Sequence, residues 1–175
     1  TAQHITLTGT GRLTFGPSSA FNGDVTSTSP ALFFNGCTFN AALNATKTGA
    51  TDDGSTGNNN FNGNATFTNN GTGYLLMTNA APDTYNADVN FVKANTGLIY
   101  PNYNNNSIYA GNLNISSTTA VTLGAGSGTA TFGGASSQNI TVTGGTPTPV
   151  FRRLAINNTG AGVYLNNTSV NVSVS

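Results

Sequence analysis

The residues of this sequence that could carry out acid–base catalysis are few and scattered. The chain has 175 residues and five acidic side chains, all of them aspartates. Glycoside hydrolysis, a reaction that some β-helices carry out, needs two carboxyl groups about 5 to 9.5 Å apart. Asp24 and Asp88 hold equivalent positions in the repeat described below, but we expect them three coils apart, about 14 Å at the strand spacing of a sheet. The sequence therefore predicts that the protein is not an enzyme.

Two adjacent carboxylates form the one candidate ion site. Asp52 and Asp53 open a stretch, residues 52–60, whose other members are glycine, serine, threonine and asparagine. Carboxylate, amide and backbone oxygens are calcium ligands, although this spacing matches neither an EF-hand nor a nonapeptide repeat. The alternative is a polar turn that widens one coil, with Lys47 offsetting its charge. We keep Asp52 and Asp53 as candidate calcium ligands and predict no other cofactor.

The single histidine and the single cysteine do not indicate a further site. The segment Gln3–Gly9 returns as Gln138–Gly144 with His4 replaced by Asn139, so we assign His4 neither catalysis nor metal binding. Cys37 has no partner for an internal disulfide. We expect it to be a small, buried apolar side chain.

The scarcity of charge excludes two classes of partner. Five basic and five acidic residues give a net charge of zero, and 6% of the residues are charged, against about 25% in ordinary soluble domains. A nucleic-acid interface needs clustered Lys and Arg, and Arg152 and Arg153 are the only adjacent pair. The sequence contains no run of about 18 apolar residues. We expect neither nucleic-acid binding nor membrane insertion.

The elements that must position these residues are short strands in a repeat. Six times an aromatic residue precedes a small or amide residue, at spacings of 18, 22, 24, 24 and 23 residues. Alternating apolar residues follow most of them, such as Val89 and Phe91, and this is the period of a strand. The six aromatic residues are Phe21, Phe39, Phe61, Tyr85, Tyr109 and Phe132.

A fixed period of this length predicts a solenoid. Strands of an antiparallel sandwich would recur every 8–12 residues or so and would not need the same aromatic residue in each unit. In a solenoid, equivalent residues of successive coils stack in columns. We predict an all-β, right-handed parallel β-solenoid (β-helix) with coils of about 18–24 residues and with the six aromatic residues as its core ladder. We also predict an asparagine ladder of Asn22, Asn40, Asn62 and Asn86.

A longer repeat lies over the short one. Gln138–Gly144 follows Gln3–Gly9 by about 135 residues, which indicates a super-repeat of that length. We therefore expect residues 1–175 to be a single β-solenoid segment, an internal fragment of a much longer repeat protein.

Two surface features offer functional alternatives. Threonine pairs such as Thr6 and Thr8 could present hydroxyl groups to ice or carbohydrate, but they return only at the super-repeat distance, as Thr141 and Thr143, so we expect no continuous array. The second feature is a group of exposed residues that could contact a glycan. These are Tyr100 and Tyr103 with Asn102, Asn104, Asn105 and Asn106.

Over nearly its whole length the sequence resembles the repeats of very large surface proteins of Bacteroidota that use type IX secretion. The segments that carry this resemblance are FNGDVTSTSPALFFNGCTFNAALNATKTGATDDGSTGNNNFNGNATFTNNGTGYLLM and FRRLAINNTGAGVYLNNTSVNVSVS. In that family such repeats form the β-solenoid shafts of adhesins or cell-surface filaments, including grappling-hook-like appendages. Export signals and binding domains lie elsewhere in those polypeptides. The resemblance implies an extracellular, cell-surface location.

Three functions follow as hypotheses. The first is the structural shaft of an extracellular adhesin or filament that mediates attachment to a surface or to other cells. Such a shaft would self-associate into a multi-chain filament or fibre, because the open ends of a solenoid expose unpaired strands. The second is an adhesive surface that binds a cell-surface glycan or another cell. The third is a degenerate carbohydrate-active β-helix.

Overall fold

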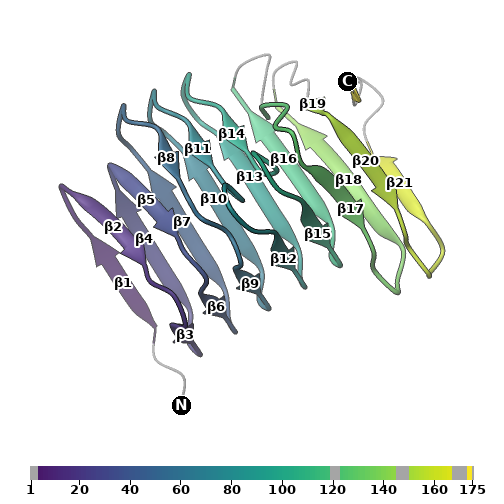
Figure 1. The fold of residues 1–175 in the computed structure, drawn as a ribbon, viewed down its shortest axis with the longest axis horizontal. Coiled ribbons are helices and arrows are strands. Elements are labelled where there is room, and N and C mark those ends of the chain that lie inside the picture. The colour runs from purple at the N-terminus through teal and green to yellow at the C-terminus, as the bar shows by residue number, and fades with distance from the viewer. Residues whose placement is uncertain (1–3, 119–122, 145–149, 167–172, 175) are drawn as a thin grey trace.

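The computed structural model describes residues 4–118, 123–144, 150–166 and 173–174. Every regular element in these residues is a strand, and the strands pair in parallel with strands of the coils before and after. Figure 1 shows the coils stacked side by side along the long axis, from purple near the N-terminus to yellow. The predicted class, an all-β parallel solenoid, is confirmed.

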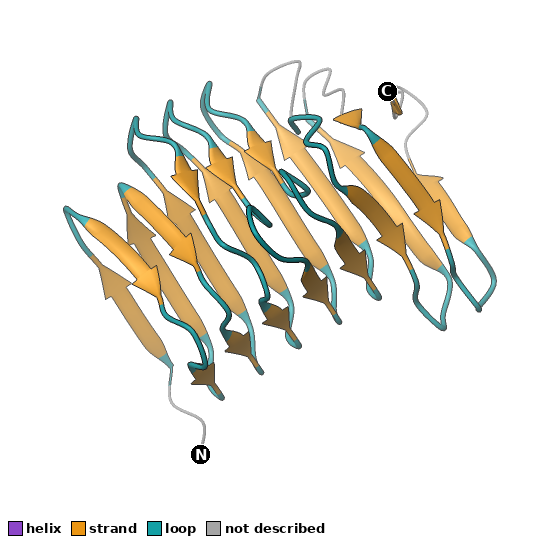
Figure 2. Ribbon diagram, in the orientation of Figure 1, coloured by secondary structure: helices purple, strands orange, loops and turns teal. Residues whose placement is uncertain are grey.

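The first face of the solenoid is an 8-stranded sheet, which we call the long sheet. Its strands run at a slant across Figure 2 and alternate with loops at the corners. They are β1 (Ile5–Thr8), β4 (Val25–Ser29), β7 (Leu43–Lys47), β10 (Ala65–Asn69), β13 (Val89–Lys93), β16 (Leu113–Ser117), β18 (Gln138–Thr143) and β21 (Val163–Asn166).

The other two faces are built of shorter strands. The second face consists of three small sheets: β2 (Arg12–Phe15) with β5 (Ala31–Phe34); β8 (Asp53–Gly54), β11 (Leu75–Leu76) and β14 (Ile99–Tyr100); and β19 (Val150–Phe151) with β22 (Ser173–Val174). The third face is a 7-stranded sheet. It contains β3 (Ala20–Phe21), β6 (Thr38–Phe39), β9 (Asn60–Phe61), β12 (Asp83–Tyr85), β15 (Ser107–Tyr109), β17 (Thr129–Phe132) and β20 (Arg153–Ile156).

The solenoid winds in the predicted right-handed sense, but the length of its coils varies more than predicted. In Figure 1 the long sheet lies at the back and its strands rise, while the second face descends in front as the coils advance towards the C-terminus, so the winding is right-handed. Asn22 and Asn40 are equivalent and 18 residues apart, whereas Asn112 and Asn139 are equivalent and 27 apart. The range of 18–24 residues was therefore too narrow, because the corner between Phe132 and β18 is longer than the others.

Alternation along the long sheet creates the core. Within β10 and β13 the side chains at the first and third positions are buried, as in the pairs Ala65 with Val89 and Phe67 with Phe91. Ile5 and Ile140 belong to the same inward column, so the segments that repeat in the sequence occupy equivalent places in the fold. Gln3 lies outside the described residues. These inward side chains form a continuous hydrophobic core to which each coil contributes.

The six predicted aromatic residues stack as one column. Ring centroids of successive members lie 4.9, 5.5, 4.9, 5.2 and 5.1 Å apart, with nearly parallel planes. Phe21 at the N-terminal end is partly buried, and the other five rings are buried. The sequence did not predict two further stacks, Phe15 on Phe34 and Phe67 on Phe91, at 5.1 and 5.5 Å.

Candidate functional site

The four predicted ladder asparagines bond to one another along the solenoid axis. Asn40 donates from Nδ2 to Oδ1 of Asn22 at 2.7 Å, Asn62 to Asn40 at 2.8 Å, and Asn86 to Asn62 at 2.7 Å. All four side chains are exposed, so the ladder stiffens a surface corner and does not serve buried backbone. It ends at Ala110, which holds the next equivalent position.

Asp24 and Asp88 each accept a hydrogen bond from the backbone of the next coil. Oδ1 of Asp24 accepts the backbone N–H of Ala42 at 3.0 Å, and Oδ1 of Asp88 accepts the backbone N–H of Asn112 at 2.8 Å. Ala42 and Asn64 occupy the two intervening coils of this column. The structure does not bring the two carboxylates together.

The candidate calcium ligands point in opposite directions. Asp53 points inward, where its Oδ2 lies 3.2 Å from Nζ of Lys47 and both side chains are 0% exposed. Asp52 is exposed and accepts the backbone N–H of Tyr74 at 2.7 Å. Within the described residues, His, Cys, Asp and Glu form no group of three or more that could hold a metal ion. The structure does not bring these two carboxylates together as ligands of one ion.

The cation at this corner is the Lys47 ammonium. Besides Asp53, it contacts three backbone carbonyl oxygens, those of Pro30 at 3.1 Å, Gly49 at 3.2 Å and Thr51 at 2.6 Å. Burial raises the pKa of the Asp53 carboxyl, while the Leu32 N–H and Lys47 counteract that shift. A buried charge is tolerated when it is paired and hydrogen-bonded, and this ammonium is both.

Next to this pair, on the second face, two side chains take the place of backbone carbonyls as acceptors between two coils. The backbone N–H of Leu32 donates to Oδ2 of Asp53 at 2.8 Å, and that of Phe34 donates to Oγ of Ser55 at 3.0 Å. Strands β5 and β8 consequently belong to different sheets. We call this contact the side-chain seam. Sequence reasoning treated residues 52–60 as a surface turn, and the burial of Asp53 and Ser55 corrects that interpretation.

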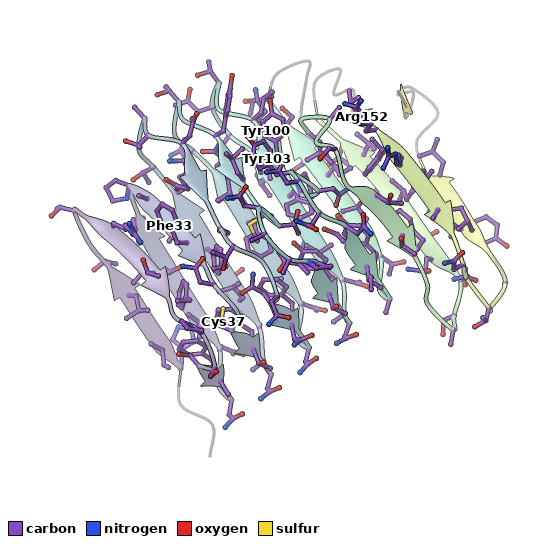
Figure 3. The ribbon with its side chains drawn as sticks, viewed as in Figure 1. Phe33, Cys37, Tyr100, Tyr103 and Arg152 are labelled. Atoms are coloured by element: carbon purple, nitrogen blue, oxygen red, sulfur yellow. The ribbon has the colours of Figure 1, made fainter. Side chains whose placement is uncertain are left out.

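Cys37 belongs to a buried polar chain at the corner between the second and third faces. Its backbone N–H and its Sγ both lie 3.1 Å from Oδ1 of Asn59, and Asn59 donates from Nδ2 to Oδ1 of Asp83 at 2.8 Å. Burial raises the pKa of the Cys37 thiol to about 12 and that of the Asp83 carboxyl to about 7. The thiol is therefore protonated and shielded, which makes it inert as a nucleophile. Figure 3 labels Cys37 near the lower edge of the solenoid.

The predicted tyrosines form an aromatic cluster on the second face. The ring of Tyr100 lies 5.4 Å from that of Tyr74 and 5.8 Å from that of Tyr103. Figure 3 shows Tyr100 and Tyr103 side by side near the upper edge. Tyr100 also covers Gly124, where no side chain would fit. Tyr74, which is 39% exposed, was missed because it comes from the preceding coil.

The asparagines beside the tyrosine cluster are mostly engaged within the chain. Asn102 is buried and its Oδ1 accepts the Tyr109 hydroxyl at 3.3 Å. Asn104 donates from Nδ2 to Oδ1 of Asn79 at 2.7 Å, and Asn105 donates to its carbonyl oxygen at 3.3 Å. Oδ1 of the fourth residue, Asn106, accepts the backbone N–H of Thr129 at 2.9 Å. These side chains hold coils together. Tyr100 and Tyr103, which were predicted to be exposed, are half-buried, and Tyr74 is the exposed ring of the cluster.

The outward face of the long sheet contradicts the expectation about threonines. Thr8, Thr28, Thr46 and Thr68 are register partners on four successive strands, β1, β4, β7 and β10. A second outward column, two residues earlier in each strand, begins with Thr6 and Thr26. The array is therefore continuous across four coils. The prediction was wrong because it looked for repeats of whole sequence segments. Strand register instead brings one residue of each coil into line, and these residues can all be threonine even when their neighbours in the sequence differ.

No protein family, curated protein or solved structure matches this chain. None of the described residues belongs to a helix that is long and apolar enough to cross a membrane.

Proposed function

We propose that this solenoid is a structural shaft segment of a large extracellular adhesin or cell-surface filament, and that it is not an enzyme. The observation that supports the proposal is the parallel pairing of equivalent strands through the long sheet, from β1 to β21. Parallel pairs place their hydrogen bonds across the strands, and in a solenoid this direction is the long axis. An axial load is then shared by many hydrogen bonds per coil on three faces.

Packing inside the shaft supports the same role. The aromatic column links each coil to both neighbours, and Phe61, for example, stacks on Phe39 at 5.5 Å and on Tyr85 at 4.9 Å. Repeat proteins gain their stability from such nearest-neighbour contacts, so added coils extend the rod without weakening it. The number of repeats then sets the length of the shaft, and the stacked columns of side chains provide its stiffness.

The surface fits a spacer better than a receptor for charged ligands. Five basic and five acidic side chains cancel, and Lys47 and Asp53 among them are buried against each other. A neutral, asparagine- and threonine-rich surface lacks the electrostatic steering that speeds the capture of charged partners. It is suited to extending a separate binding domain away from a cell.

The shaft proposal can be tested on polypeptides that contain one, two and four copies of the chain. Small-angle scattering and negative-stain electron microscopy should give rods whose length increases in proportion to copy number while their width stays constant. Compact or flexible particles would contradict the shaft. Antibodies against the chain should label the outside of intact producing cells, and labelling only after lysis would contradict the cell-surface location.

The tyrosine cluster favours a second candidate function, binding of a cell-surface glycan. Exposed rings are common anchors at binding surfaces because they offer a large apolar area with a polar tip. We expect Tyr74→Ala and Tyr103→Ala to reduce retention on the recognised glycan in an array. Phe33→Ala is the control, since Phe33 also lies on the second face but pairs with Arg12, whose guanidinium lies 4.2 Å from its ring centroid.

A further inference from the structure

The outward side of the long sheet carries a two-dimensional array of hydroxyl groups over its first four strands. The array consists of the first and third side chains of residues 6–8, 26–28, 44–46 and 66–68, and all of them except Asn44 are threonines. We call it the threonine patch. Its spacing is about 4.8 Å between strands and about 6.7 Å along each strand, because the backbone sets both distances.

The side chains of the threonine patch are rigid and available to solvent. Threonine is β-branched and restricted at χ1, so its hydroxyl and methyl groups lose little freedom when a surface is bound. In the described part of the chain, the hydroxyls of Thr28, Thr46 and Thr68 make no hydrogen bond to another protein group, whereas Thr66 Oγ1 accepts Nδ2 of Asn90 at 3.2 Å. The array is thus preorganised for an external partner that offers both donors and acceptors.

The side chains of the patch suit neither a charged partner nor a partner that stacks on aromatic rings. None of its eight side chains carries a charge, and Lys47, which lies on β7 beside Thr46, points inward to Asp53. The patch contains no aromatic ring on which a sugar could stack. A shallow groove of about 210 Å³ does lie on this sheet, but it extends around Val92, Ser116 and Thr143, beyond most of the patch.

We propose that the threonine patch binds ice. Ice is an uncharged lattice of water molecules, each both donor and acceptor, and its in-plane repeats are close in size to the two spacings of the patch. Water held by the hydroxyls between rows of methyl groups takes up positions that continue into that lattice. The proposal rests on the register of four strands and is independent of the shaft function.

The test uses the whole 175-residue chain. Ice recrystallisation inhibition and thermal hysteresis are measured for the unaltered protein, for Thr28→Tyr and for Thr46→Tyr. Tyrosine is well tolerated in strands, so it should preserve the fold while lifting the ice surface away from the patch. The matched control is Thr84→Tyr, which places the same side chain outward on the third face, at β12. Circular dichroism and the melting temperature verify folding.

We expect the unaltered chain and Thr84→Tyr to be equally active, and each patch variant to need at least a tenfold higher concentration for the same inhibition. An inactive unaltered chain, or equal losses in Thr84→Tyr and Thr46→Tyr, would overturn the proposal. Binding to an insoluble uncharged polysaccharide such as cellulose is measured alongside. If Thr46→Tyr abolished that binding while no protein affected ice, the partner would be a polysaccharide and the ice assignment would be wrong.

Discussion

Lys47 and Asp53 form an ion pair inside the solenoid, with 3.2 Å between Nζ and Oδ2 and no solvent exposure of either side chain. Asp53 occupies a column whose other members are apolar, namely Leu13, Leu32, Leu75, Ile99 and Leu123. A carboxylate in a leucine column is stable only because an ammonium and a backbone N–H compensate it. The pair also links the coils of β5 and β8, through the Leu32 N–H that donates to Asp53 and the Pro30 carbonyl that accepts from Lys47.

Breaking this pair should be costly. Lys47→Met leaves a buried carboxylate without its cation and should reduce the free energy of unfolding by about 3–5 kcal/mol. The double variant Lys47→Met, Asp53→Leu removes both charges and should recover part of the loss. Chemical denaturation measures both changes. Asp52→Asn is the control, and it should stay within about 0.5 kcal/mol of the unaltered protein. A silent Lys47→Met with a destabilising Asp52→Asn would contradict this account.

The aromatic column should matter more than any surface residue. Phe61→Ala should cost about 3–5 kcal/mol, because it removes a buried ring and leaves a cavity between Phe39 and Tyr85. The damage should spread along the axis, so hydrogen exchange should accelerate in the coils on both sides. By contrast His4→Asn, at an exposed position, should change stability by less than about 0.5 kcal/mol. Faster exchange confined to β9 would argue against stacking as the source of stability.

The free energy of unfolding should fall as the pH rises from about 4 to about 7. Burial raises the pKa of Asp83 to about 7, against about 3.9 in an unfolded chain. Between these values the native state binds more protons than the unfolded state, so stability decreases from about pH 4 to pH 7 and levels off above. Asp53, whose pKa is also raised by burial, acts in the same direction.

The replacement Asp83→Asn isolates this effect. The amide keeps an oxygen that can accept the two hydrogen bonds from Asn59 but cannot ionise. We expect the melting temperature of Asp83→Asn to depend less on pH than that of the unaltered protein between pH 4 and 8. Asp88→Asn is the control and should retain the full dependence. Identical profiles for Asp83→Asn and the unaltered protein would show that another group titrates.

The C-terminal end should promote association of the isolated chain. Ile156 and Leu165 are 51% and 48% exposed, and they line an apolar groove with Ile140, Leu154 and Val163. Exposed apolar surface beside β21, the last strand of the long sheet in the described part of the chain, favours contact between copies. Sedimentation at increasing concentration should detect oligomers, and Leu165→Lys should reduce them. A monodisperse monomer at high concentration would be contrary to this expectation.

Residues that repeat their own type were predictable from the sequence. Phe61 and Asn62 recur as a pair in other coils, so both the aromatic column and the asparagine ladder could be identified before the structure. Asp53 could not, because nothing in its local sequence distinguishes an inward carboxylate from the outward one of Asp52. Its burial depends on Lys47, which belongs to another face of the same coil.

The threonine patch was missed although the sequence contains it. Thr28, Thr46 and Thr68 each stand seven residues after the aromatic residue of their coil, and counting from Phe21, Phe39 and Phe61 would have aligned them. The coils differ by several residues elsewhere, so comparison of long segments obscures this agreement. Counting from the inward aromatic residue aligns these three coils, because the corner between that residue and the long-sheet strand has the same length in each of them.

The side-chain seam gives the rod a place where its strength can be changed by mutation. Backbone pairing is the same whatever the side chains, but the contact between β5 and β8 depends on Asp53 and Ser55, which hold the N–H groups of Leu32 and Phe34. A single substitution there alters the cohesion of two coils and leaves the others unchanged. Because β4 still pairs with β7 and β6 with β9, such a substitution would weaken the junction on one face only, so the rod could bend more easily there while the other two faces keep the coils joined.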